Sequence, residues 1–161
     1  MKAPLLTIAV CAAMAVAGCG SSSSSSESTG TTEATSAANK TKPTVEVPKG
    51  SPPKSLVVKE IEKGSGEEAK SGDEVTVQYV GVDYKNGKEF DSSWSRSEPF
   101  TFTLGAGQVI PGWEKGVEGM KVGGRRELII PPELAYGKAG SPPAIGPNET
   151  LVFVIDLLEI G

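Results

Sequence analysis

The sequence predicts an α+β domain in which an antiparallel sheet of about five strands curls around one short helix. Apolar and polar residues alternate in residues 73–84 and again in residues 100–104, as they do in half-buried strands. Residues 150–160 are apolar on both faces, which places them at the centre of the sheet. Residues 112–120 have the spacing of a short amphipathic helix, so we expect one helix against the sheet.

The first strands are bounded by turn residues. Residues 56–61 form a short strand candidate that ends at the glycine- and serine-containing stretch 63–66. The long strand that follows ends before the Asn86-Gly87 pair, which is typical of a type I′ hairpin turn. Residues 88–91 should therefore return antiparallel to the long strand.

The helix and the remaining strands follow from spacing in the second half of the chain. Pro111 lies where the start of a helix tolerates proline, and Trp113, Val117 and Met120 recur at helical intervals. Residues 126–130 form a further strand before the apolar final one. No internal repeat interrupts this series, so we expect a single folded domain.

Composition excludes several classes of function. The chain has 161 residues and a net charge of −4, which suits one domain plus appendages. Its basic residues are interleaved with acidic ones, which argues against a nucleic-acid partner. It has no histidine, which removes the Ser/His/Asp triad, Cys/His pairs and most zinc sites. The glycine pairs lack phosphate-loop spacing and the acidic pairs lie in turns, so we expect no cofactor and no metal ion.

The first nineteen residues have the pattern of an export signal. Lys2 precedes an apolar run at residues 5–16, which is shorter than the about 20 residues that a membrane-spanning helix needs. The run ends in Val-Ala-Gly-Cys at residues 16–19, which resembles the lipobox of bacterial lipoproteins. That resemblance implies cleavage before Cys19, acylation of the cysteine (palmitate being a typical acyl chain), and anchoring outside the cytoplasm at the bacterial cell membrane. A plain signal peptide with an accidental cysteine is the alternative.

These patterns divide the chain into three parts. Residues 1–18 are predicted to be the signal peptide, and residues 19–53 to be the lipidated cysteine followed by a disordered linker. The linker is rich in serine and threonine and cannot bury enough apolar surface to offset its ordering entropy. Residues 54–161 are the predicted folded domain, for which a monomer is expected because the sequence has no visible dimerisation patch.

Aromatic residues beside sharp turns are the most informative feature of the predicted domain. The motifs in question are Phe90-Asp91-Ser92-Ser93, Leu104-Gly105, Val109-Ile110-Pro111-Gly112-Trp113-Glu114-Lys115-Gly116-Val117, Gly119-Met120, Val122-Gly123, Ile130-Pro131-Pro132, Ala135-Tyr136-Gly137 and Leu151-Val152-Phe153. In this order and spacing they resemble the FKBP family of peptidyl-prolyl cis–trans isomerases, from residue 55 to residue 161. The fold of that family, an antiparallel sheet curled around a short helix, agrees with the prediction from periodicity.

The resemblance implies a proline-binding pocket. By this resemblance, Trp113 matches the residue at the floor of the pocket. The residues that match its walls or substrate contacts are Tyr79, Phe90, Phe100, Val109, Ile110, Ile145 and Phe153. The Tyr136 hydroxyl and the Ile110 backbone N–H resemble donors to substrate carbonyls. Asp91 matches the family's site carboxylate, and Arg96 lies where an arginine would orient it. The resemblance therefore makes Asp91, Tyr136, Trp113 and Phe90 the candidate catalytic residues, with Asp91 interpreted as an organiser of the site rather than a proton donor.

The activity implied is rotation about X–Pro bonds in proline-containing, exported polypeptides. No covalent bond breaks in this reaction, so neither a nucleophile nor a histidine is needed. A non-catalytic module that docks proline-containing segments is the alternative. Rapamycin-type macrolides bind this family, but Ser141 stands where some members have a histidine and Ala144 where many have a bulkier residue. These two differences bear on substrate preference and macrolide affinity.

Overall fold

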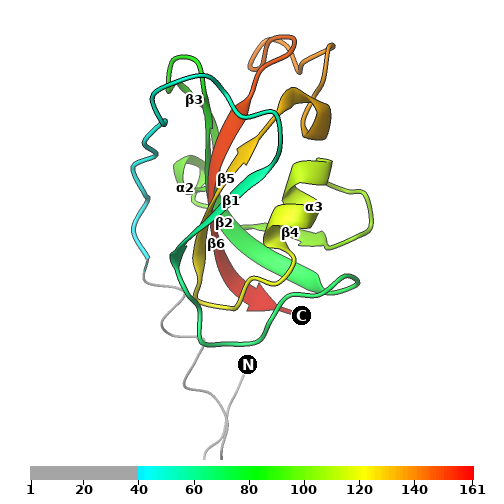
Figure 1. Ribbon diagram of the computed structural model, residues 1–161. Coiled ribbons are helices and arrows are strands. Elements are labelled where there is room, and N and C mark those ends of the chain that lie inside the picture. Colours follow the sequence, from blue (N-terminus) through cyan, green and yellow to red (C-terminus); the bar gives the residue numbers. More distant parts are fainter. Residues whose placement is uncertain (1–39) are drawn as a thin grey trace, which may run out of the picture. The chain divides into compact units, whose positions relative to one another are not determined.

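The computed structural model describes residues 40–161, and Figure 1 shows a sheet with one short helix on one of its faces. In chain order the elements are β1 (Val57–Glu62), β2 (Glu74–Asp83), β3 (Glu89–Ser92), α2 (Ser93–Arg96), β4 (Phe100–Thr103), α3 (Pro111–Val117), β5 (Arg125–Ile130), η1 (Pro132–Leu134) and β6 (Leu151–Ile160). The predicted signal peptide, Cys19 and the first part of the predicted linker lie outside the described residues. None of the helices in the described range is long and apolar enough to cross a bilayer.

The strands pair antiparallel in the order β1-β5-β6-β2-β3, and β4 also pairs with β2. β6 lies between β5 and β2, and its central place confirms the prediction from its two apolar faces. Residues 40–161 contain six strands, whereas the sequence predicted about five. The difference arises because β4 pairs with the first half of β2 and β3 with the second half, so the two share one position in the sheet.

The helix α3 packs on what we term the inner face of the sheet, where the main core lies. Gly112 and Gly116 make this approach close, because a Cβ at either position would overlap Ile130 or Leu128 of β5. Trp113 and the other two predicted apolar helix positions are buried in the core. The strand residues of this core include Val75, Val77, Tyr79, Phe102, Leu128, Ile130, Leu151, Phe153, Ile155 and Leu157.

The helix is shorter than predicted. The sequence predicted a helix through residue 120, but α3 ends at Val117 because Glu118 leaves the helical region (φ −53°, ψ 131°). Gly119 then adopts a left-handed φ of 76°, which turns the chain away from the helix axis. Met120 keeps its predicted place in the core from this turn. Two further short helical segments, α2 and η1, were not predicted.

The hairpin between β2 and β3 forms as predicted, but its type I′ turn does not. A type I′ turn needs positive φ at both central residues, and only Gly87 of the Asn-Gly pair has it (φ 70°). The loop instead closes through Asp83, whose carbonyl oxygen accepts a hydrogen bond from the Gly87 amide at 2.8 Å. The Asp83 carboxylate also accepts hydrogen bonds from the Lys85 amide and the Asn86 side chain, both at 2.8 Å. An aspartate that precedes the turn thus selects a longer loop than the Asn-Gly pair alone predicts.

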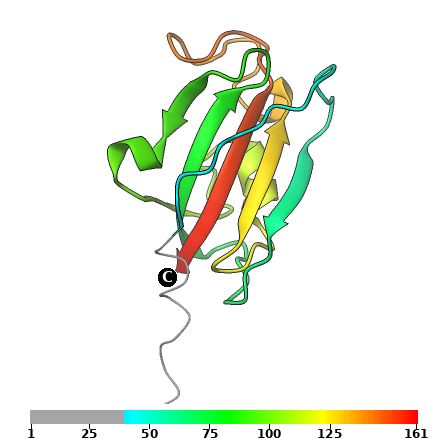
Figure 2. The ribbon, with the colours of Figure 1, turned by 90° about the vertical axis from the view of Figure 1, so that its left-hand side faces the viewer.

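Residues 40–53, which we refer to as the strap, lie on the outer face of the sheet, opposite α3. In Figure 2 the cyan part of the chain crosses in front of β6. Val45 and Val47 of the strap pack on a second apolar cluster formed by Val80, Val82, Tyr84, Ile129 and Val152. The linker prediction covered these residues, and the structure places them against the sheet.

Polar contacts tie the beginning of the strap to four different strands. Lys40 forms ion pairs with Glu62 on β1 and with Asp156 on β6 (3.7 Å). Arg125 on β5 donates to the Thr41 carbonyl oxygen (2.9 Å), and Lys42 forms an ion pair with Glu89 on β3 (2.8 Å). The strap is therefore held by both apolar and charged groups.

Candidate functional site

A cavity of about 410 Å³ lies on the inner face beside α3, and we term it the aromatic pocket. Its lining residues are Tyr79, Phe90, Asp91, Phe100, Gln108, Val109, Ile110, Trp113, Tyr136 and Phe153. They come from β2, β3, β4, α3, β6 and the loops next to α3 and η1. The structure therefore brings together residues that lie up to 74 positions apart, since the set runs from residue 79 to residue 153.

Trp113 is the one aromatic residue of α3 and is 4% exposed. Its ring makes edge-on contacts with Tyr79 at a centroid distance of 5.0 Å and with Phe153 at 5.3 Å. Phe100 and Phe102 lie at 6.1 and 5.8 Å from it. Edge-to-face pairs of this kind are favourable beyond the area that they bury. The four neighbours therefore hold the indole in one orientation at the wall of the pocket.

Phe90 and Phe153 form the wall next to β2. Their rings meet edge to face, with centroids 5.6 Å apart. Gly81 makes room for them, because a Cβ there would lie 2.7 Å from Phe153 and 2.8 Å from Phe90. Such distances are too short for any side chain, so this strand position requires glycine. Gly81 was not among the predicted site residues, although a glycine inside an apolar strand is a signal of close approach.

Asp91 lies in a hydrogen-bonded triangle with Tyr79 and Arg96. The Tyr79 hydroxyl donates to Asp91 Oδ2 at 2.5 Å, and Arg96 Nη2 donates to the Tyr79 oxygen at 2.8 Å. Arg96 Nη1 closes the triangle with an ion pair to Asp91 Oδ1, which also accepts from the Ser92 amide at 2.8 Å. Both carboxylate oxygens are thus engaged by donors within the protein. This arrangement suits the interpretation of Asp91 as an organiser of the pocket wall.

The short helix α2 brings Arg96 over the Tyr79 ring, with the guanidinium carbon 5.6 Å from the ring centroid. The helix is fastened by Ser93, which is fully buried and whose hydroxyl accepts from the Tyr79 amide at 2.8 Å. Ser93 in turn donates to the side chain of Gln78. A buried serine hydroxyl that both donates and accepts a hydrogen bond fixes the backbone around it. Ser93 therefore positions both Tyr79 and the helix that carries Arg96.

Two hydrogen-bond donors remain available at the pocket. The Tyr136 side chain is 40% exposed, and its hydroxyl has no hydrogen-bond partner within residues 40–161. The Ile110 amide, which precedes α3, also donates to no group in the same part of the chain. Both resemble the donors that the sequence implied. A bound peptide could satisfy each of them with a carbonyl oxygen.

The loop after η1 contributes less to the pocket than the sequence implied. Ile145 is 5% exposed and belongs to the main core, so it does not line the cavity. It is paired through backbone hydrogen bonds with Ser141, which is exposed, as is Ala144. Gln108 was not among the predicted site residues, yet it lines the pocket, and its side-chain oxygen accepts a hydrogen bond from the Thr103 amide at 3.1 Å.

Burial raises the pKa of both pocket tyrosines. For Tyr79 the hydrogen bond to Asp91 adds to this effect, while Arg96 opposes it. For Tyr136 the negative charge of Asp91 is the second cause. A raised pKa means that the stabilisation from each neutral phenol is fully present below the unfolded value of 10.0 and is lost as the pH rises through the folded pKa.

For the cis–trans exchange that the family resemblance implies, we expect kcat/KM to be level from about pH 6 to pH 9, because the chain has no histidine and phenols ionise near pH 10. It should fall only at a pH above the 10.0 of an ordinary tyrosine, as the two phenols lose their protons. Exchange spectroscopy on a proline-containing peptide measures this without a coupling protease. Tyr136→Phe should remove part of the alkaline fall, whereas Tyr84→Phe, outside the pocket, should leave it unchanged. A fall centred below pH 9 would contradict the assignment.

The pocket has the means to bind and orient an apolar group rather than to break a covalent bond. It offers aromatic walls, two available donors and a carboxylate that is already paired. Among residues 40–161 there is no group of three or more His, Cys, Asp or Glu side chains placed to bind a metal ion. These groups can surround an apolar ring and donate hydrogen bonds to carbonyl oxygens beside it.

Comparisons with known proteins agree with this arrangement. Residues 65–158 match the family described as FKBP-type peptidyl-prolyl cis-trans isomerase. The FK506-binding protein of Streptomyces anulatus is 56% identical over 120 residues, which cover 74% of this chain and 97% of that protein. The probable FK506-binding protein of Corynebacterium glutamicum is 52% identical over 118 residues, 73% of this chain and 98% of that one. The crystal structure of AtFKBP13 matches with a TM-score of 0.62 and 39% identity, over 66% of this chain and 93% of that chain.

The family match spans more than half of the chain, and the two bacterial relatives are covered almost completely. The antiparallel sheet around α3 is the fold that the resemblance implied, and it is shared with the solved relative. The chain belongs to the FKBP-type peptidyl-prolyl cis–trans isomerases.

Proposed function

We propose that the aromatic pocket accelerates rotation about X–Pro bonds in exported polypeptides, and so speeds slow steps in their folding. The observation that supports this is the enclosed set of aromatic rings around Trp113, next to the free Tyr136 hydroxyl and the free Ile110 amide. An apolar ring of proline size suits the walls. The two donors suit carbonyl oxygens on either side of it.

The physical basis of the rate increase is the difference in polarity between the planar and the twisted amide. Rotation must overcome a barrier of about 18–20 kcal/mol, because amide resonance is lost on the way. The twisted transition state has less charge separation than the planar ground state. An apolar pocket therefore favours the transition state over the ground state, and that difference lowers the barrier.

The same pocket is proposed to take macrolides of the rapamycin and FK506 type. Two relatives with more than half of their residues identical are named FK506-binding proteins. Ser141 and Ala144 belong to the exposed loop near Ile145, and their small side chains leave fewer apolar contacts for a large ring. We expect binding of FK506 that is weakened by this loop rather than lost.

The experiment that tests the isomerase proposal measures cis–trans exchange of a Leu-Pro or Phe-Pro peptide. It uses the chain that begins at residue 19, with Cys19→Ser to keep it soluble, and a third sample with rapamycin. Acceleration that the macrolide abolishes would support both the enzyme and the pocket. A folded chain that does not accelerate exchange would favour the alternative, a module that docks proline-containing segments without turnover.

The membrane location rests on the first nineteen residues, which precede the described part of the chain. We propose that Cys19 is acylated and tethers the enzyme outside the cytoplasm of a bacterial cell. Metabolic labelling with a palmitate analogue tests this directly. The full-length chain should carry the label and sediment with membranes, and Cys19→Ala should abolish both. Label that persists in that variant would contradict the proposal.

Asp91→Val is expected to lower kcat/KM by about tenfold or more, because a small misplacement of pocket groups has a large effect on rate. Valine cannot accept from Tyr79 or Arg96, so both lose their fixed orientation. The ion pair is 41–46% exposed, so the free energy of unfolding should change by no more than about 1 kcal/mol.

Glu89→Gln is the matched control, since it removes the same charge from the same strand outside the pocket, and it should leave kcat/KM unchanged. If Asp91→Val loses turnover but still rescues client folding, the docking alternative is the better account of the biological role. If Asp91→Val keeps full turnover, catalysis in the pocket does not depend on the hydrogen-bonded triangle.

A further inference from the structure

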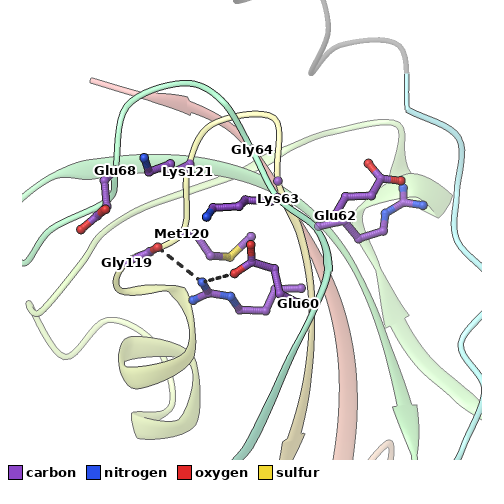
Figure 3. A pocket seen from close by; sticks show the side chains of 11 residues that line it. Glu60, Glu62, Lys63, Gly64, Glu68, Gly119, Met120 and Lys121 are labelled. Atoms are coloured by element: carbon purple, nitrogen blue, oxygen red, sulfur yellow. Dashed lines mark hydrogen bonds and ion pairs between the residues drawn. The ribbon is translucent and has the colours of Figure 1, made fainter.

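The C-terminal end of α3 is held by the side chain of Arg126. The guanidinium donates to the carbonyl oxygens of Gly116 at 2.8 Å, Glu118 at 3.2 Å and Gly119 at 3.4 Å. Its remaining contact is with Glu60 on β1, at 3.3 Å. Figure 3 shows this end of the helix, with dashed lines that reach Gly119 and Glu60. One side chain thus satisfies carbonyl groups that a helix end otherwise leaves without donors.

Arg126 belongs to a row of β5 residues that contacts α3 along its length. Alternate residues of a strand share a face, so Arg126, Leu128 and Ile130 point to the same side. Ile130 lies against Gly112 and Leu128 against Gly116, both too close for a Cβ. The two glycine contacts let the helix approach the sheet, but apolar contacts of this kind are not directional. Arg126, the third of these β5 residues, supplies directional contacts through its hydrogen bonds at the C-terminal end of α3.

The helix depends on such contacts because it is short. Seven residues are too few for a helix to persist in water without tertiary support. No side chain caps its N-terminus, where Ile110 is the capping residue. The Arg126 side chain is only 11% exposed, so its hydrogen bonds are shielded from competing water. A positive charge at the C-terminal end also complements the helix dipole.

We infer that Arg126 is a positioning residue for the isomerase reaction. It determines where α3 lies along β5, and thereby where Trp113 and the Ile110 amide lie in the aromatic pocket. Arg126 does not line the aromatic pocket, so its effect on the pocket passes through α3. The inference rests on the proposed function of the pocket.

The test uses Arg126→Met and Arg126→Lys in a Trp94→Phe background, where Trp113 is the one tryptophan left of two. Arg126→Met should shift the Trp113 emission to longer wavelength, raise its acrylamide quenching, and lower both FK506 affinity and kcat/KM by about tenfold. Arg126→Lys keeps the charge but not the fork of donors, so it should recover part of each loss. Glu60→Gln removes the β1 partner and leaves the helix contacts intact, so it should match the parent.

A merely structural role would give a different result. If both Arg126 variants lower the melting temperature but keep the parent's emission, FK506 affinity and kcat/KM, the inference is wrong. If Arg126→Met does not fold, the same comparison in Arg126→Lys decides. Failure of the proposed function is distinguishable, because the parent itself would then not accelerate exchange, while Trp113 emission would still report whether Arg126 positions α3.

Discussion

Trp113→Ala is expected to abolish measurable peptide exchange and to lower the free energy of unfolding by about 3–5 kcal/mol. The side chain is 4% exposed and contacts four aromatic rings, so its removal leaves a cavity that these neighbours cannot fill without moving. Collapse of the rings would also destroy the shape of the aromatic pocket. Urea unfolding and peptide exchange measure the two effects separately.

The matched control is Trp94→Ala on the outer face, where Trp94 packs against the second apolar cluster. It should destabilise the protein yet keep kcat/KM in the folded fraction. Trp113→Phe preserves an aromatic surface and should retain part of the activity. A folded Trp113→Ala variant with the parent's exchange rate would show that the indole is not part of the active pocket.

Arg125→Met is expected to lower the free energy of unfolding by about 3–5 kcal/mol, because it leaves the buried Asp156 carboxylate without its paired cation. Asp156 is 1% exposed and accepts from Arg125 Nε at 2.6 Å and Nη2 at 2.7 Å. The remaining cation near it, Lys40, lies at 3.7 Å and cannot replace the paired hydrogen bonds. Urea unfolding of the variant and the parent measures the difference.

The double variant Arg125→Met with Asp156→Leu tests the cause. Replacing both charges by apolar groups removes the unpaired buried carboxylate, so the double variant should be more stable than Arg125→Met alone. Neither residue lines the aromatic pocket, so kcat/KM should be unchanged in the folded fraction. A double variant that is less stable than the single one would show that Asp156 is stabilised by other groups.

The strands were predictable because their signals are local. Alternation placed β2 and β4, and the two apolar faces of the last strand placed β6 at the centre of the sheet. The end of α3 was not predictable from spacing, since the turn at Gly119 interrupts a pattern that continues to Met120. The strap was also missed, although Val45 and Val47 alternate with exposed residues as a strand would. The serine- and threonine-rich residues before it favoured the prediction of a disordered linker over this short alternation.

The pocket could not be predicted from local patterns, because its residues are far apart in the chain. No periodicity places Phe90 next to Phe153, and only resemblance to a family identified them as one set. Gly81 was not predicted as a site residue, although a glycine inside an apolar strand is a signal of close approach. Ser93 was named only within a family motif, because its role of holding the backbone through buried hydrogen bonds leaves no mark in composition. Gln108 is a polar residue in a loop, and no pattern distinguishes it from solvent-exposed neighbours.

The strap determines where tension on the N-terminal side of the domain is borne. Its first residues contact β1 and β6 through Lys40 and β5 through Thr41, so a pull acts on the edge strand and on the middle of the sheet at the same place in the chain. The load then acts on ionic and apolar contacts of several strands together, rather than opening one strand pair at a time. A domain held this way should stay folded while the chain ahead of it is stretched.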